Sequence, residues 1–133
     1  KDGVDVGAHF VMTGHTVYDV IDPGVPATLS KKITTEMLRN DLGFNGLIIT
    51  DDLSEMPFII GRDIDRAEAA AGALLAGHNL VIFSHRLKKT QDIFEKLLKR
   101  VQSDQELRTL IENNYRKTIL FKQKYFSGVA NNL

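Results

Sequence analysis

The sequence predicts an α/β fold, the C-terminal portion of a (β/α)8 TIM barrel. Three short apolar runs lie at residues 10–12, 47–49 and 80–83, and helical patterns fill the intervals between them. The runs start 37 and then 33 residues apart, from 10 to 47 to 80, which is the spacing of parallel βαβ units. A complete barrel has eight such units in about 250 residues, so three units and a terminal helix correspond to its last part. A doubly wound sheet that lacks its first half is the alternative.

The strands and the first two helices follow from local patterns. Each apolar run is continuous rather than alternating, as expected for strands covered on both faces. The first helix is expected to begin near Ser30, a suitable N-cap, and to end at Gly43. Its predicted inner face consists of Ile33, Met37, Leu38 and Leu42. The second helix is rich in alanine, runs from about Arg66 to Ala76 and ends at Gly77.

Two longer helical patterns close the chain. One spans roughly Leu87 to Val101 and predicts an inward set of Ile93, Phe94, Leu97, Leu98 and Val101. The other begins with a capping box at residues 103–106, Ser-Asp-Gln-Glu. Its apolar stripe is predicted to consist of Leu107, Leu110, Ile111, Tyr115, Ile119 and Phe126. We therefore expect residues 1–133 to form a single partial domain.

Composition and charge narrow the class of protein. The 17 basic and 17 acidic side chains cancel, although residues 1–65 carry most of the acidic ones and residues 66–133 most of the basic ones. The basic half is spread along helical patterns without interleaved aromatic residues, so we interpret it as a solvated surface and expect no nucleic-acid partner. No apolar run approaches the ~20 residues of a membrane helix. The absence of cysteine excludes a disulfide framework and a Cys nucleophile.

Polar side chains follow all three apolar runs. The first run ends in Thr-Gly-His at 13–15, the second in Thr-Asp-Asp at 50–52, and the third in Ser-His at 84–85. Active sites of parallel α/β folds form at the carboxyl ends of their strands. We therefore expect these side chains to lie together at the edge formed by the carboxyl ends of the strands, which we call the rim. The long segment 14–29, stiffened by two prolines, is expected to shape a pocket there.

The acidic pair Asp51 and Asp52 is the sharpest local feature. A carboxylate at a strand end can be a nucleophile, a metal ligand or a helix cap. With His15 and His85 nearby, a zinc site is conceivable, but neither HxH nor HExxH spacing occurs, and we expect no metal and no cofactor. No glycine-rich phosphate loop is present either. His78, at a helix-to-strand turn, is interpreted as structural.

Three segments carry a resemblance to a known family. They are Val-Met-Thr-Gly-His at 11–15, Asp-Pro-Gly-Val-Pro-Ala-Thr-Leu-Ser at 22–30, and Leu-Arg-Asn-Asp-Leu-Gly-Phe-Asn-Gly-Leu-Ile-Ile-Thr-Asp-Asp-Leu at 38–53. Together they resemble glycoside hydrolase family 3, and most closely its bacterial β-N-acetylhexosaminidase branch. The similarity extends over nearly the whole chain.

The resemblance implies a retaining hydrolase on a (β/α)8 barrel. Asp51 matches the family's nucleophile, the Asp directly after Ser or Thr at a strand end, which would form a covalent glycosyl-enzyme. His15, Asp52 and Met56 would line or brace the sugar pocket. The implied substrate carries a terminal β-linked N-acetylglucosamine, as in peptidoglycan-derived or chitin-like sugars. A β-glucosidase-like family 3 hydrolase remains the alternative sugar specificity.

The sequence also departs from the family pattern. The acid/base of this branch resembles an Asp–His pair within a Lys-His-Phe-Pro-Gly-His-Gly type motif, which the 133 residues do not contain. We therefore expect the isolated chain to be inactive, and we expect a longer protein because the first residue is Lys rather than Met. If the native chain is this short, a non-catalytic partial-barrel interaction module that self-associates through open strand edges is the alternative. The compartment, cytoplasmic or exported and lipid-anchored, stays open.

Overall fold

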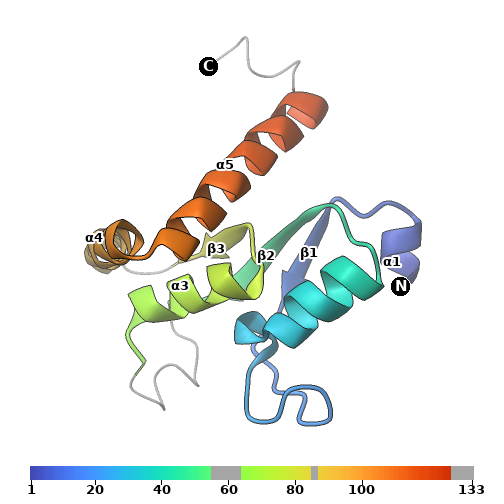
Figure 1. The fold of residues 1–133 in the computed structure, drawn as a ribbon, viewed down its shortest axis with the longest axis horizontal. Coiled ribbons are helices and arrows are strands. Elements are labelled where there is room, and N and C mark those ends of the chain that lie inside the picture. The colour runs from blue at the N-terminus through green and yellow to red at the C-terminus, as the bar shows by residue number, and fades with distance from the viewer. Residues whose placement is uncertain (55–63, 85–86, 127–133) are drawn as a thin grey trace.

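The computed structural model describes residues 1–54, 64–84 and 87–126 and contains one parallel sheet (Figure 1). Its strands are β1 (Phe10–Thr13), β2 (Leu47–Asp52) and β3 (Leu80–Ile82), in the order β1-β2-β3. Phe10 pairs with Leu47 and Thr13 with Thr50, both in parallel register. The predicted α/β fold with three parallel βα units and a terminal helix is confirmed.

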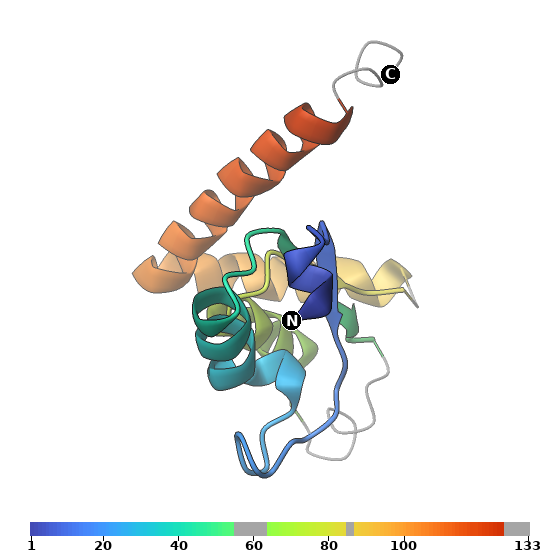
Figure 2. The same ribbon diagram turned by 90° about the vertical axis from the view of Figure 1, so that its right-hand side faces the viewer.

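Helices flank this sheet and connect its strands. The bounds of the helical segments are α1 Asp2–Asp5, η1 Ala27–Leu29, η2 Lys32–Asp41, α3 Arg66–Ala76, α4 Leu87–Ser103 and α5 Gln105–Phe126. In both views η2 and α3 lie side by side on one face of the sheet (Figures 1 and 2). Helix α5 runs from α3 and α4 toward the start of β1, where Phe121 packs against Phe10 with ring centroids 5.0 Å apart. None of the described helices combines the length and apolarity needed to cross a membrane.

The first long helix, η2, forms where the sequence predicts it but winds more widely. The Ser30 hydroxyl accepts a hydrogen bond from the Ile33 amide at 3.1 Å, and Gly43 at φ 68° ends the helix. The Leu42 amide bonds to the Met37 carbonyl, five residues earlier, which is π-helical spacing. This winding shifts the inner face: Thr34 is fully buried while Met37 is exposed, so the prediction of Met37 as an inner residue was wrong.

Helix α3 supplies the small side chains that form the centre of the core. The Asp65 carboxylate caps it by accepting a hydrogen bond from the Ala67 amide at 2.8 Å, and Gly77 at φ 117° ends it. Both ends agree with the prediction. Its alanines let the helix lie close to its neighbours, and they pack with larger apolar residues of other elements, namely Leu53, Val81, Leu97, Leu107 and Ile111.

The inner faces of α4 and α5 are narrower than predicted. On α4, Leu97 and Val101 pack against the core, but Phe94 is 62% and Leu98 45% exposed. These two belong to a neighbouring stripe of the helix that faces solvent in this chain. On α5, Tyr115 and Phe126 are likewise exposed.

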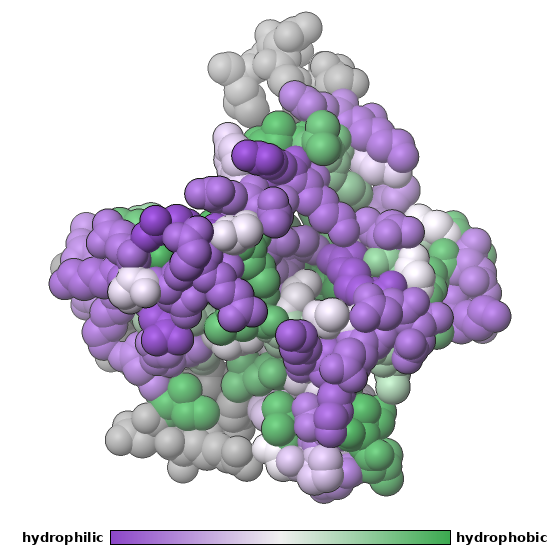
Figure 3. Space-filling view, viewed as in Figure 1, coloured by the Kyte–Doolittle hydropathy of each residue, from purple (hydrophilic) through white to green (hydrophobic). Residues whose placement is uncertain are grey.

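A polar residue, Asn114, forms part of the inner face of α5. Asn114 lies partly buried among its apolar neighbours and bonds to the main chain of His78 and the side chain of Asn79. The N-cap also moves by one residue, because Asp104 rather than Ser103 accepts the hydrogen bond from the Leu107 amide. The face shown in Figure 3 is mostly hydrophilic, with smaller hydrophobic areas between the polar ones.

Candidate active site

The two faces of the sheet have different environments. Side chains alternate between the faces of a strand, so Thr13 and Thr50 point toward the helices and are buried. Met12, on the opposite face of β1, is 57% exposed. Its parallel partner in β2 is Ile49. Two residues further along β2, the Asp51 side chain is exposed at the carboxyl end of the strand.

Asp51 keeps its carboxylate accessible. Its Oδ1 accepts a hydrogen bond from the Asp52 amide at 2.7 Å, which fixes the side-chain rotamer without covering the second oxygen. Among the described residues, this carboxylate has no other hydrogen-bond partner. A carboxylate that is oriented yet accessible is suited to attack a bound ligand.

Asp52 is held in a different way. Its Oδ1 accepts hydrogen bonds from the amides of Ser54 at 2.8 Å and Ser84 at 3.1 Å, and its Oδ2 accepts one from the Ser84 hydroxyl. Partial burial by itself raises the pKa of the Asp52 carboxyl, but the hydrogen bonds from Ser84 and Ser54 outweigh it and hold that pKa well below its usual range. Asp52 is therefore an ionised group that ties the end of β2 to the end of β3.

His15 ties the end of β1 to the same point. Its Nε2 lies 3.1 Å from the main-chain carbonyl of Asp52, and its Nδ1 lies 2.7 Å from the Thr28 hydroxyl. Thr28 in turn donates to the carbonyl of Gly14 at 2.8 Å. Because a carbonyl only accepts, Nε2 is the donor in this bond. Both ring nitrogens of His15 are thus engaged within the chain.

The structure brings together the predicted rim residues that it describes. Asp51, Asp52, His15 and Ser84 all lie at the carboxyl ends of the strands. Met56 and His85, which the sequence analysis also names, lie outside the described residues. Among the described residues, no group of three or more His, Asp or Glu side chains is arranged to hold a metal ion.

Thr28 and Ser54 make contacts at the rim that were not predicted from the sequence. Thr28 reaches His15 because the segment after β1 folds back on itself: Val17 pairs with Pro26 as an antiparallel bridge, and the Ala27 amide bonds to the Thr16 carbonyl. One sequence feature could have indicated Thr28. It directly follows Pro26 and Ala27, at the point where the proline-stiffened segment 14–29 returns to the rim. Ser54 contacts Asp52 through its amide and its side chain, and no motif in the sequence marked it.

A second polar cluster lies at the opposite end of the sheet. Arg39 donates to the carbonyls of Phe44 at 2.9 Å and Gly46 at 2.5 Å, and to the side chain of Asn79. Asn79 also accepts a hydrogen bond from the Ile48 amide at 2.9 Å. Burial lowers the pKa of Arg39. These contacts fix the entry into β2 and have a structural role.

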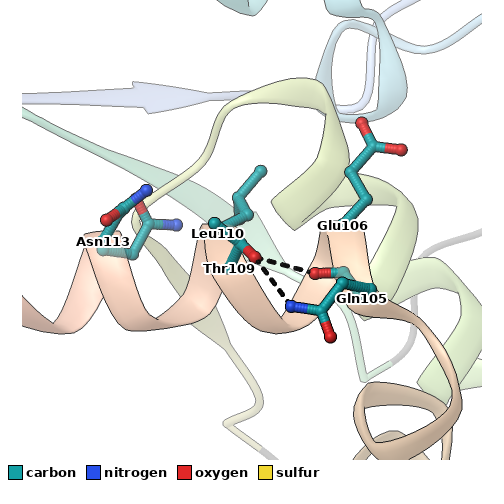
Figure 4. Close-up of a pocket in the computed structure, with 6 residues that line it drawn as sticks. Gln105, Glu106, Thr109, Leu110 and Asn113 are labelled. Carbon is teal, nitrogen blue, oxygen red and sulfur yellow. Dashed lines mark hydrogen bonds between the residues drawn. The ribbon is translucent and has the colours of Figure 1, made fainter.

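Two surface pockets formed by the described residues lie away from the rim. One, of about 580 Å³, is lined by one helix, α5 (Figure 4), where Thr109 donates to the carbonyl of Gln105 at 2.9 Å. The other, of about 540 Å³, lies between α1, the entry into β2 and the end of α5, with His9, Phe44 and Lys117 in its wall. Neither contains a residue of the rim.

Three parallel βα units with an accessible carboxylate at a strand end define an α/β protein whose candidate site lies at the carboxyl ends of the strands. The chain belongs to glycosyl hydrolase family 3: the model of that family's N-terminal domain matches residues 1–120. Curated relatives agree. A β-hexosaminidase of Nitrosomonas eutropha is 36% identical over 95 residues, which are 71% of this chain and 26% of the relative.

Solved structures show the same fold. A β-N-acetylhexosaminidase from Beutenbergia cavernae superposes with a TM-score of 0.83 at 32% identity, over 90% of this chain and 35% of that one. A family 3 β-N-acetylglucosaminidase from Paenibacillus sp. str. FPU-7 superposes with a TM-score of 0.79 at 31% identity. The match covers 92% of this chain and 23% of that one. The chain spans about a quarter of the length of the curated relatives that it matches.

Proposed function

We propose that this chain is the nucleophile-bearing part of a retaining β-N-acetylglucosaminidase. Its substrate class is a sugar with a terminal β-linked N-acetylglucosamine, either peptidoglycan-derived or chitin-like. The observation that carries the proposal is the position of Asp51, an oriented and accessible carboxylate at the carboxyl end of β2. The names of the relatives, β-hexosaminidase and β-N-acetylglucosaminidase, support the choice of sugar.

In the first half of the reaction, an Asp51 oxygen attacks the anomeric carbon while the bond from that carbon to the leaving oxygen breaks. The product is an ester between the sugar and Asp51, formed with inversion. Water then attacks the same carbon, releases the carboxylate and inverts the centre again, so the β configuration is retained. The leaving oxygen needs a proton, and the acid/base that supplies it is expected outside these 133 residues.

The remaining rim residues shape the site around this reaction. His15, Asp52 and Met56 line or brace the sugar pocket. The open face of the sheet, with Phe10 and Met12 about half exposed, becomes the inner wall of the barrel once the other units are present. Residues 1–133 are in this view one partial domain, without hydrolytic activity on their own.

The test replaces the nucleophile in a complete barrel that contains this sequence. Asp51→Asn keeps the size of the side chain and removes its negative charge, so we expect turnover of 4-nitrophenyl N-acetyl-β-D-glucosaminide to be abolished. Asp104→Asn is the matched control, because asparagine caps a helix as well as aspartate does; its turnover should equal that of the unmodified enzyme. Near-normal turnover by the Asp51 variant would rule the assignment out.

Sugar specificity is tested by a side-by-side assay of the same enzyme. We expect kcat/KM for the N-acetylglucosaminide to exceed that for the corresponding β-glucoside. The relatives that are named for N-acetylated sugars and match at more than 30% identity support this order. The opposite order would assign the chain to a β-glucosidase-like enzyme and leave the role of Asp51 intact.

A further inference from the structure

We infer that Asp52 is a positioning residue that aims the Asp51 carboxylate, rather than a group that binds the sugar. The inference rests on the proposed function, since it concerns the same reaction. It follows from three observations: the environment of Asp52 compared with that of Asp51, the partners of the Asp52 carboxylate, and the way in which both chain neighbours of Asp51 are tied to adjacent strands.

The first observation is that the two acidic residues have different environments. The ladder with β1 is regular up to Thr50, which is fully buried on the side of the helices. Beyond Thr50, the Asp51 side chain is exposed, whereas the Asp52 side chain is partly buried and held against Ser84 after the end of β3. A sugar can therefore reach the Asp51 carboxylate more readily than the Asp52 carboxylate.

The second observation is that contacts within the chain engage both carboxylate oxygens of Asp52. The main-chain amides and the side chains of Ser54 and Ser84 hydrogen-bond to them. A carboxylate gains more from such charge-assisted bonds than a neutral acceptor does. A sugar hydroxyl would have to compete with donors that the fold already holds in place.

The third observation is an irregularity in the sheet at this point. Ile49 pairs with Leu80 and Asp52 with Ile82, so that three steps along β2 oppose two along β3. Such a bulge bends a strand and redirects a side chain, and bulges are over-represented beside active sites. Asp51 lies within this bulge, and the regular ladder does not fix its direction.

Its two neighbours fix that direction instead. On one side, the Thr50 hydroxyl accepts a hydrogen bond from the Ile82 amide at 3.0 Å. On the other side, the Asp52 carboxylate is tied to Ser84, and the Asp52 carbonyl lies 3.1 Å from Nε2 of His15. Asp52 thereby links the ends of β1, β2 and β3, and its own amide donates to Asp51 at 2.7 Å.

The expected consequence is catalytic. A nucleophile displaced by about 1 Å can lose on the order of 10²-fold in rate. If Asp52 acts through Asp51, its loss lowers kcat and leaves KM close to the original value, because the sugar contacts remain. Loss of a sugar ligand would instead raise KM, with or without a change in kcat.

The experiment compares four variants in a complete barrel, with 4-nitrophenyl N-acetyl-β-D-glucosaminide as substrate. We expect Asp52→Ala to lower kcat by roughly 10²-fold and Ser84→Ala by about tenfold. The double variant should be no slower than Asp52→Ala alone, since both changes remove the same link. Asp52→Asn should recover most of the rate, because its amide can accept from both main-chain donors and donate to the Ser84 hydroxyl.

Asp65→Ala is the matched control for loss of a carboxylate that has a structural role. Asp65 also accepts a main-chain hydrogen bond, and Lys96 beside it lowers its pKa, but it caps α3. Its thermal midpoint should fall while kcat stays unchanged. A raised KM for Asp52→Ala with normal Ser84→Ala kinetics, or additive effects in the double variant, would overturn the positioning role.

Failure of the proposed function gives a different result. In Asp51→Gly, added azide can take the place of the missing carboxylate: it attacks the anomeric carbon, 4-nitrophenolate leaves, and an α-glycosyl azide forms. That product shows that Asp51 is the nucleophile, whatever the Asp52 variants do. If Asp51→Gly retains turnover without azide, the proposed function fails together with the positioning role.

Discussion

Nε2 of His78 lies 2.7 Å from the hydroxyl of Thr13, so a residue just before β3 is bonded to the last residue of β1. Nδ1 of the same ring donates to the carbonyl of Ala73 at 2.8 Å, which leaves Nε2 to accept from Thr13. The ring is completely buried. Burial, assisted by the positive charge of Arg39, lowers the pKa of His78 to about 4.

The lowered pKa of His78 predicts how the free energy of unfolding depends on pH. The unfolded chain takes up a proton on His78 below about pH 6.5, while the folded chain does so only near pH 4. The free energy of unfolding should therefore be fully retained above pH 6.5 and fall by roughly 3 kcal/mol as the pH drops to 4. Urea unfolding at several pH values measures this fall, and His78→Gln should remove most of it. If the free energy of unfolding of that variant fell with pH as steeply as that of the unmodified chain, the attribution of the fall to His78 would be contradicted.

Gly46 is required for space rather than for backbone conformation. A Cβ added there would collide with the main-chain carbonyl of His9 and the ring of Phe44. We expect Gly46→Ala to cost about 1–3 kcal/mol of unfolding free energy, measured by urea denaturation. Gly3→Ala is the control, because a Cβ at Gly3 meets nothing within 4 Å; it should cost nothing. Equal stability of the two variants would show that the entry into β2 adapts freely.

The isolated chain should self-associate. Phe10 and Met12 are 47% and 57% exposed on the open face, and among the described residues the outer edges of β1 and β3 have no strand beside them. Open edges and apolar faces promote pairing with other chains. Light scattering after size exclusion should give a mass above 14.9 kDa that falls in a Phe10→Ser, Met12→Ser variant. A monomer at all concentrations would contradict this expectation.

The isolated chain should also lack hydrolytic activity, even when it is folded. Loss of an acid/base costs about 10²–10⁴-fold in an intact site, and here the sugar pocket is incomplete as well. The measurement is release of 4-nitrophenolate by the purified 133 residues beside a complete barrel at equal concentration. Clear turnover by the short chain would mean that its own residues supply a proton donor.

Local chemistry made much of the fold predictable. Helix α3 formed as expected between Asp65 and Gly77 because a cap and a left-handed glycine act over a few residues. The three strands were recognisable because each apolar run is short, continuous and followed by polar residues. The position of Asp51 at a strand end followed directly from the second of these runs.

Features that depend on distant partners were not predictable. The inner stripe of α5 turns toward Asn114 because His78 and Asn79, more than thirty residues earlier, offer polar partners. Helix η2 winds with π-type spacing, so a stripe of period 3.6 misplaced Met37. At the rim, the contacts of Asp52 with Ser84 and His15 depend on how three strand ends meet, which no local pattern encodes.

The central claim is that Asp51 attacks the sugar, and a covalent label tests it most directly. A complete barrel containing this sequence would be incubated with an N-acetylglucosaminyl substrate that carries fluorine beside the ring oxygen and a good leaving group, which slows breakdown of the glycosyl-enzyme by destabilising its oxocarbenium-like transition state. After digestion, mass spectrometry should find one sugar on the peptide that contains Asp51. A label on another carboxylate, or rapid hydrolysis with an inverted product and no label, would contradict the account.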